Sequence, residues 1–236
     1  AWPVKYPPLE SRFLAQACDD RGDGPNSPMT DAIHRPPAMS AASQRQPLLL
    51  ALLAATIAAL IVSGWRPYDR LTWLMEVLPV LVALPLLIVT RDRYPLTTLL
   101  YVLIFLHGLV LIGGGAYTYA RVPAGAWVQE WFGLARNPYD KLGHFAQGFV
   151  PALIAREILV RGAFVRGARM TAFLCVCVAL AISAAYELVE WWAALSLGQG
   201  ADEFLGTQGD QWDTQSDMFL ALIGATVAMA TLSRYH

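Results

Sequence analysis

The sequence contains little charge. Only 15% of its 236 residues are Asp, Glu, Lys or Arg, whereas soluble globular proteins carry about 25%. Hydrophobic residues make up 56% of the chain, and the mean hydropathy is +0.43. So few charges cannot cover the surface of a water-soluble domain, and so many apolar residues exclude disorder for most of the chain. The composition therefore predicts an integral membrane protein, with the lipid bilayer as its main partner.

Cysteine is scarce as well, and neither sign of charge is in clear excess. Of the three Cys residues, Cys18 lies in a polar segment, while Cys175 and Cys177 lie two apart in an apolar run. This pattern is neither a disulfide framework nor a zinc motif. The formal net charge of −1 argues against a nucleic-acid partner.

Residues 1–47 lack any long apolar segment and are rich in Pro, Asp and Ser. We expect this segment to be a disordered tail. It also lacks the charged-then-apolar order of a signal peptide. Met29 and Met39 are both candidate start residues, so we expect residues 1–38 to be partly non-native.

Six apolar runs follow, each long enough to cross a hydrocarbon core of about 30 Å at about 1.5 Å per residue. Because the apolar residues are continuous rather than alternating, they indicate helices and not barrel strands. We therefore predict an all-α integral membrane protein, with a six-transmembrane-helix bundle over residues 48–236 after the disordered N-terminal tail. The expected spans are 48–64, 71–90, 96–115, 142–160, 170–195 and 216–232.

Basic residues in the loops indicate the orientation. With the N-terminus inside, eight basic residues lie at the inner side and five at the outer side. The inner ones are Arg45, Arg91, Arg93, Arg156, Arg161, Arg166, Arg169 and Arg234, and the outer ones are Arg66, Arg70, Arg121, Arg136 and Lys141. We therefore predict that both termini face the cytoplasm. In the long outer loop, Trp127 and Trp131 lie four apart, which favours an interfacial helix or, alternatively, a lid.

Ionisable residues interrupt five of the six runs, although each costs about 2.5–3.5 kcal/mol at the centre of a membrane. They are Glu76, His107, His144, Glu187, Glu190, Asp213 and Asp217. All lie within about 12 Å of the outer face, so we expect them to share one outward-opening pocket. Residues three or four apart share a helix face, as do His144 with Gln147, Glu187 with Glu190, and Asp213 with Asp217.

Three functions fit this cluster. The first is a metal or acid–base site, in which His144, Glu187 and Glu190 are the candidate catalytic residues. The candidate ligands of a divalent metal such as zinc or manganese are His144, Glu187, Glu190, Asp213 and Asp217, and the candidate substrate-binding residues are Asp140, Lys141, Gln147 and Asp210. The second is a transport or proton pathway. The third is internal pairing in a non-catalytic scaffold, with Lys141 bound to a glutamate and Asp213 or Asp217 capping the last helix.

Three stretches of sequence are distinctive: RNPYDKLGHFAQGF (136–149), YELVEW (186–191) and LGTQGDQWDTQSDM (205–218). They resemble the YjdF-like family of bacterial inner-membrane proteins, a family without an assigned function, over about residues 48–234. The resemblance implies a six-helix protein of the inner membrane. Relatives often carry His before the Tyr-Thr-Tyr motif, where this sequence has Ala116.

A looser similarity links the chain to the VanZ-like family. It rests on an Asp-Lys-x-x-His-Phe motif at 140–145 that opens one helix, and on acids in the two later helices. By analogy it implies cell-envelope or lipid-linked substrates. Our leading expectation is a membrane-embedded enzyme acting on such a molecule, with a divalent metal as the candidate cofactor. A small transporter or proton-coupled carrier and a non-catalytic membrane scaffold are the alternatives, and the oligomeric state is open.

Overall fold

The computed structural model describes residues 41–197 and 207–233. This part of the chain contains seven helices and no strand, which confirms the predicted all-α class. The helices are α1 (Ala41–Trp65), α2 (Arg70–Thr90), α3 (Thr98–Tyr117), α4 (Pro123–Phe132), α5 (Tyr139–Arg161), α6 (Ala168–Leu197) and α8 (Asp213–Thr231). Most of the tail that we expected at 1–47, namely residues 1–40, lies outside the described residues.

The helix boundaries differ most from the prediction at the N-terminal end of α1. We expected this helix to begin at Leu48, but it begins at Ala41 and contains Pro47. A proline interrupts a helix because it lacks an N–H group. The preceding Ala, Gln and Arg residues are strong helix formers, however, and they extend α1 beyond Pro47. Residues 41–47, which we assigned to the tail, are thus part of α1 in the structure.

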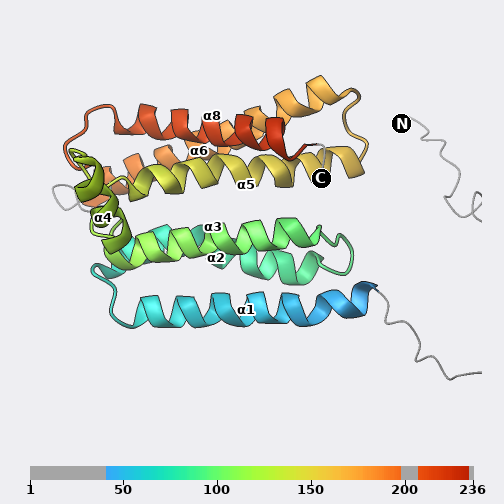
Figure 1. Cartoon of the computed structure of the whole chain (residues 1–236), viewed down its shortest axis with the longest axis horizontal. Helices are drawn as coiled ribbons and strands as arrows, with labels where there is room; N and C mark the ends of the chain where they lie inside the picture. The colour runs from blue at the N-terminus through green and yellow to red at the C-terminus, as the bar shows by residue number, and fades with distance from the viewer. Residues whose placement is uncertain (1–40, 198–206, 234–236) are drawn as a thin grey trace, which may run out of the picture. The chain divides into compact units, whose positions relative to one another are not determined.

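Four helices are long and apolar enough to cross a membrane: α1 from Arg45 onward, α2, α3 and α6. α5 and α8 do not meet this description, because their first turns carry acidic and other polar residues. Length and composition thus support four spans directly, and the predicted count of six is not confirmed by them. Figure 1 shows these six long helices running side by side, with the short α4 across one end.

α5 packs against α3, α6 and α8. Its contact with α8 is very close: Gly148 lies against the backbone of Ala221, and Gly224 lies against the backbone of Phe145. Small residues allow membrane helices to approach until their backbones touch. This seam fixes the first turns of α5 and α8, which carry most of the polar cluster, relative to each other.

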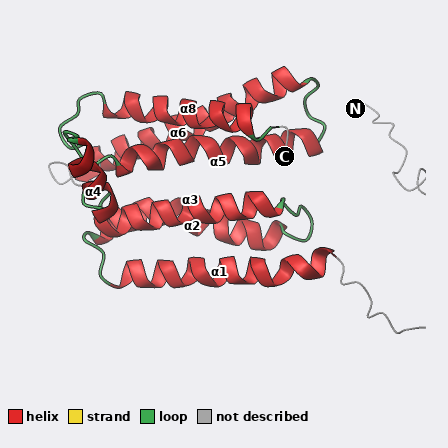
Figure 2. Cartoon of the chain, in the orientation of Figure 1, coloured by secondary structure: helices red, strands yellow, loops and turns green. Residues whose placement is uncertain are grey.

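The loops gather at the two ends of the helices (Figure 2). At the end where α5 and α8 begin, which we call the site end, buried Asn137 joins three segments. Its side chain donates to the Val122 carbonyl (3.0 Å) and accepts from the Tyr139 amide (3.0 Å). Its backbone N–H donates to the side-chain oxygen of Gln208, and its carbonyl accepts from the side-chain nitrogen of the same residue. On α4, Trp127 and Trp131 are both exposed. The helical face expected for these two residues is present, and their position at a membrane interface stays a prediction.

Candidate functional site

His144 is the centre of the polar cluster. It lies in the second turn of α5, one turn after Asp140, and both residues are buried with 8% of their surface exposed. Its Nε2 atom is 3.3 Å from Oδ1 of Asp140 and 3.7 Å from Oδ2 of Asp217 on α8. Its Nδ1 atom is 3.1 Å from Oε1 of Gln147 and 3.8 Å from Oε1 of Glu187 on α6. Three helices therefore meet at this imidazole.

Lys141 and Arg136 bind the acids at the start of α8. The Lys141 ammonium lies 3.2 Å from Asp217 and 3.7 Å from Asp213, and it also donates to Ser216. The Arg136 guanidinium lies 2.5 Å from Asp213 and 3.7 Å from the more exposed Asp210. These contacts join the first turns of α8 to the first turn of α5 and to the loop before it.

Arg136 lies in the loop between α4 and α5, outside the long helices. Burial by itself would lower the pKa of its guanidinium, but the hydrogen bond and charge of Asp213 and the charges of Asp140 and Asp210 raise it instead. The residue is therefore a permanent cation that neutralises Asp213.

A second polar group lies beside the first. Glu76 on α2 is buried and accepts a hydrogen bond from the Tyr186 hydroxyl of α6 at 3.0 Å. His107 on α3 has a buried Nε2 atom with no hydrogen-bond partner among the described residues. Together with Glu190, these side chains form the wall of a cavity.

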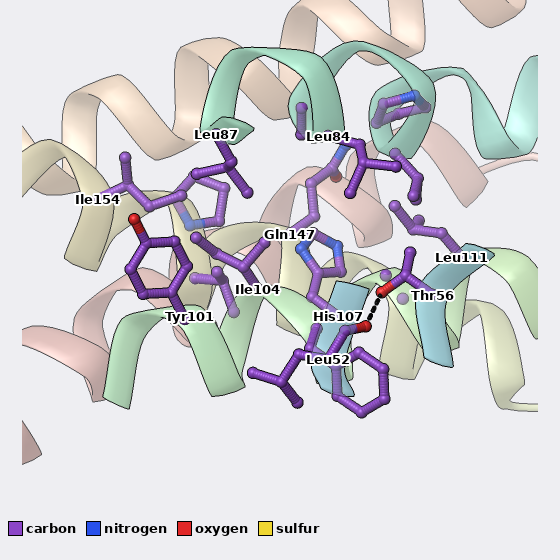
Figure 3. A pocket seen from close by; sticks show the side chains of 18 of the residues that line it. Leu52, Thr56, Leu84, Leu87, Tyr101, Ile104, His107, Leu111, Gln147 and Ile154 are labelled. Atoms are coloured by element: carbon purple, nitrogen blue, oxygen red, sulfur yellow. Dashed lines mark hydrogen bonds between the residues drawn. The ribbon is translucent and has the colours of Figure 1, made fainter. Parts of the chain in front are cut away.

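The cavity has a volume of about 310 Å³ and is lined by residues of α1, α2, α3, α5 and α6. Its polar wall is formed by Glu76, His107, Tyr119, Asp140, His144, Gln147, Tyr186 and Glu190. The remaining lining is mostly apolar and continues toward Arg91 at the other end of α2. Figure 3 shows His107 and Gln147 among the aliphatic side chains of Leu52, Leu84 and Ile104, where Thr56 bonds to the Leu52 carbonyl.

The structure brings the predicted site residues together, but in three groups. Asp140, His144, Gln147 and Glu190 line the cavity, whereas Lys141, Glu187, Asp213 and Asp217 are outside its lining and contact one another or His144. Asp210 is half-buried in the loop before α8, where its side chain accepts from the Trp212 amide. Of the expected metal ligands, only His144 and Asp217 fall in the group of atoms close enough to share an ion, and Asp140 completes that group.

Two details of the internal-pairing alternative differ from expectation. Lys141 is bound to aspartates of α8 and not to a glutamate. Asp213 and Asp217 do not cap α8, because its N-cap residue is Trp212 and Asp217 lies one turn inside the helix. Within the described part of the chain, the structure places no Lys or Arg within ion-pair distance of Glu187, Glu190 or Glu76.

Sequence reasoning did not assign roles to Arg136, Tyr119 or Tyr186. Tyr186 precedes Glu187 directly, and its hydroxyl reaches Glu76 on another helix. Tyr119 is buried and lies under Gly114 and Gly143, where an added Cβ would meet its ring. All three residues belong to the conspicuous polar stretches around 117–119, 136–149 and 186–191, but only the packing of the helices shows which partner each one meets.

These features define a helical membrane protein with a His/carboxylate cluster buried at one end of its helices. The chain matches the family described as "Predicted membrane protein (DUF2238)" over residues 48–236. It is 65% identical over 192 residues to the inner membrane protein YjdF of Escherichia coli (strain K12), which covers 81% of this chain and 92% of that protein. The chain therefore belongs to the YjdF family, which confirms the resemblance seen in the sequence. No solved structure matches it.

Proposed function

We propose that this protein is a membrane-embedded enzyme of the bacterial inner membrane that acts on a lipid-linked molecule of the cell envelope. The hydrocarbon part of the substrate would lie in the cavity, and its polar part would meet His144, Glu190 and Glu76. The observation that carries this proposal is the cavity itself, whose lining is apolar over most of its length and acidic at one end.

The chemistry of the polar wall supports an acid–base role. A catalytic acid or base must lie within reach of the reacting group and must exchange protons readily. His144 lines the cavity and contacts Asp140 on one side and Glu187 on the other. Glu187 has a buried Oε1 atom without a hydrogen-bond partner among the described residues. In this proposal Glu190 exchanges protons with the substrate, while Glu187 helps to position the imidazole of His144 beside it.

The topology that we propose has six spans. α5 and α8 contain 23 and 19 residues, which correspond to about 34 and 28 Å of helix. The first exceeds a hydrocarbon core of about 30 Å, and the second nearly equals it. Their charged first turns then lie at the outer surface. The excess of basic residues at the opposite ends favours cytoplasmic termini and a periplasmic site end.

Two neighbouring substitutions test the role of the cavity. Ala83 lines it, whereas Val82 is the next residue on α2 and is exposed to the surroundings of the helices. Ala83→Trp should fill the cavity, and Val82→Trp adds the same side chain outside it. Purified protein in nanodiscs made from bacterial lipid extract would be analysed by native mass spectrometry. We expect a retained lipid-linked species in the wild type and in Val82→Trp, and its loss in Ala83→Trp.

The reaction is tested by incubating the same nanodiscs with an envelope lipid extract and following lipid-linked species by mass spectrometry. We expect one species to be converted, and Glu190→Gln to slow this conversion by about 100-fold or more, as general acid–base catalysis contributes. Retention without conversion would overturn the enzyme in favour of a scaffold. Accumulation of a solute in proteoliposomes, abolished by Glu187→Gln, would overturn it in favour of a transporter.

A further inference from the structure

We propose that Asp140, His144 and Asp217 are the protein ligands of one divalent metal ion, with zinc or manganese as the preferred ions. Binding of the ion stands on these three residues alone, whereas its use in catalysis rests on the function proposed above. The sequence alone favoured a different set of metal ligands, because it paired residues three or four apart on one helix, such as Glu187 with Glu190. The tertiary structure selects one acid from the start of α5, the imidazole one turn later, and one acid from α8.

The distances between the ligand atoms fit a shared ion. One atom from each of the three residues lies within 4.8 Å of the others, and Nε2 of His144 is 3.3 and 3.7 Å from the two carboxylate oxygens. Tetrahedral zinc with bonds of about 2.0–2.2 Å separates its ligands by about 3.3–3.6 Å. Hydrogen bonds between charged groups are shorter, at about 2.7–2.9 Å. The two distances from His144 therefore lie close to the spacing of ligands around an ion and are longer than those of two strong hydrogen bonds.

The partner of the other ring nitrogen, Gln147, leaves Nε2 of His144 free for a metal ion. Oε1 of Gln147 can only accept a hydrogen bond, so Nδ1 of His144 donates to it at 3.1 Å. With Nδ1 protonated, Nε2 faces Asp140 and Asp217 either as the N–H of an imidazolium or, in the neutral ring, as a lone pair that a metal ion between them would accept. Histidine ligands of metals usually donate their second ring N–H in this way.

The balance of charge also favours a cation. Five buried acids lie at the site end, and besides His144 the basic residues that contact them are Arg136 and Lys141. These acids are Glu76, Asp140, Glu187, Asp213 and Asp217. Oδ2 of Asp140 is buried without a hydrogen-bond partner in the described part of the chain. A buried carboxylate in this state is costly unless it is paired or binds a metal.

The ligand types and their surroundings indicate the ion and its access. One imidazole with two carboxylates suits zinc or manganese better than calcium or magnesium, which prefer oxygen ligands only. Catalytic zinc sites keep three protein ligands and leave one position for water or substrate. Asp140 and His144 also line the cavity, so a molecule bound there can reach that position. Asp217 closes the opposite side, held by Lys141.

The test measures metal content and affinity without any assay of activity. The full chain, with its affinity tag removed, would be purified in detergent without chelator and analysed by inductively coupled plasma mass spectrometry. We expect about one zinc or manganese ion per chain. In competition titrations with Zn²⁺, Asp140→Asn and Asp217→Asn should each weaken binding by more than about 100-fold, beyond the range for an outer-shell partner. Gln147→Leu should weaken it by about 10- to 100-fold.

Asp213→Asn is the matched control. It removes one buried carboxylate from the same helix as Asp217, but Asp213 is paired with Arg136 and lies outside the group of ligand atoms. We expect it to bind Zn²⁺ within a few-fold of the wild type. Equal losses in Asp213→Asn and Asp217→Asn would overturn the proposal, since they would indicate a diffuse effect of charge.

Thermal unfolding and gel filtration separate loss of a ligand from loss of the fold. The visible spectrum of bound Co²⁺ gives a second measurement, which should show nitrogen and oxygen ligation in the wild type and vanish in folded Asp140→Asn. A folded wild-type protein that binds neither Zn²⁺, Mn²⁺ nor Co²⁺ would overturn the metal centre and would indicate that His144 is an imidazolium paired with both aspartates. Such a result would leave lipid retention in the cavity, and hence the proposed function, intact.

Discussion

The seam between α5 and α8 gives the sharpest prediction from this structure. Gly148 and Gly224 lie on facing helices, each against the backbone of the other helix. A Cβ atom added to Gly148 would lie well under 3.0 Å from the carbonyl oxygen of Ala221, which real Cβ atoms essentially never do. Because the obstacle is backbone, no side-chain rotation relieves it. Gly148→Ala must therefore push α5 and α8 apart.

The expected magnitude follows from overpacking, which costs about 1–3 kcal/mol per site and occasionally more. Replacing Gly by Ala also stabilises a helix by about 1 kcal/mol through helix propensity. The control must therefore be another Gly→Ala substitution within a helix. Gly108→Ala provides it: Gly108 is a buried glycine of α3, and its added Cβ would make an ordinary contact with Val80 at 3.8 Å. We expect Gly148→Ala to be less stable than Gly108→Ala by about 1–3 kcal/mol, a factor of about 5 to 150 in the unfolding equilibrium.

The assay is equilibrium unfolding in mixed micelles with increasing SDS, followed by tryptophan fluorescence. The double variant Gly148→Ala, Gly224→Ala should lose less stability than the sum of its single variants, because one separation of the helices relieves both contacts. The same separation moves Asp217 away from His144, so affinity for Zn²⁺ should fall with stability. If Gly148→Ala were as stable as Gly108→Ala, the close α5–α8 packing described above would be wrong.

Two further predictions concern the ends of the helices. Asp69 caps α2 by accepting from the Thr72 amide at 2.7 Å, and this hydrogen bond lowers the pKa of its carboxyl below the ordinary value of 3.8. Asp69→Ala should therefore destabilise the protein by about 0.5–2 kcal/mol, whereas Asp69→Asn keeps most of the cap. Because the pKa of Asp69 is depressed in the folded state, the difference in free energy of unfolding between wild type and Asp69→Ala should be complete above pH 3.8. It should shrink as the pH falls through the folded pKa. A difference that grows in acid would contradict the cap. For topology, in a variant with its native cysteines replaced by Ser, Gln211→Cys should react with an impermeant maleimide in intact cells, and Arg166→Cys only after permeabilisation. The reverse labelling would refute the cytoplasmic termini.

The local sequence determined the helices well. Long apolar runs identified α2, α3 and α6 to within about two residues at each end, because a continuous apolar segment of this length has no other stable form in a membrane. The same signal was weaker at α5 and α8. Their first turns, at Tyr139–Lys141 and Asp213–Gln215, are helical although polar, since tertiary contacts with Arg136 and Lys141 stabilise them.

The level of the polar residues was also encoded in the sequence. The depth of His144, Glu187 and Asp217 along their helices follows from counting residues, since each residue advances an α-helix by about 1.5 Å. This count placed the acids and imidazoles at one end, and the structure brings His144 within 4 Å of acids from α5, α6 and α8.

Only the tertiary structure decided which of these residues are partners. Rotation of each helix about its axis is set by packing, in particular by the approach of Gly148 to Ala221, and no periodic pattern in nearly uniform apolar helices reveals it. That rotation directs Asp140 and Asp217 to one nitrogen of His144, places Glu187 at the other, and assigns Asp213 to Arg136. It also places Glu190 and His107 on the wall of one cavity.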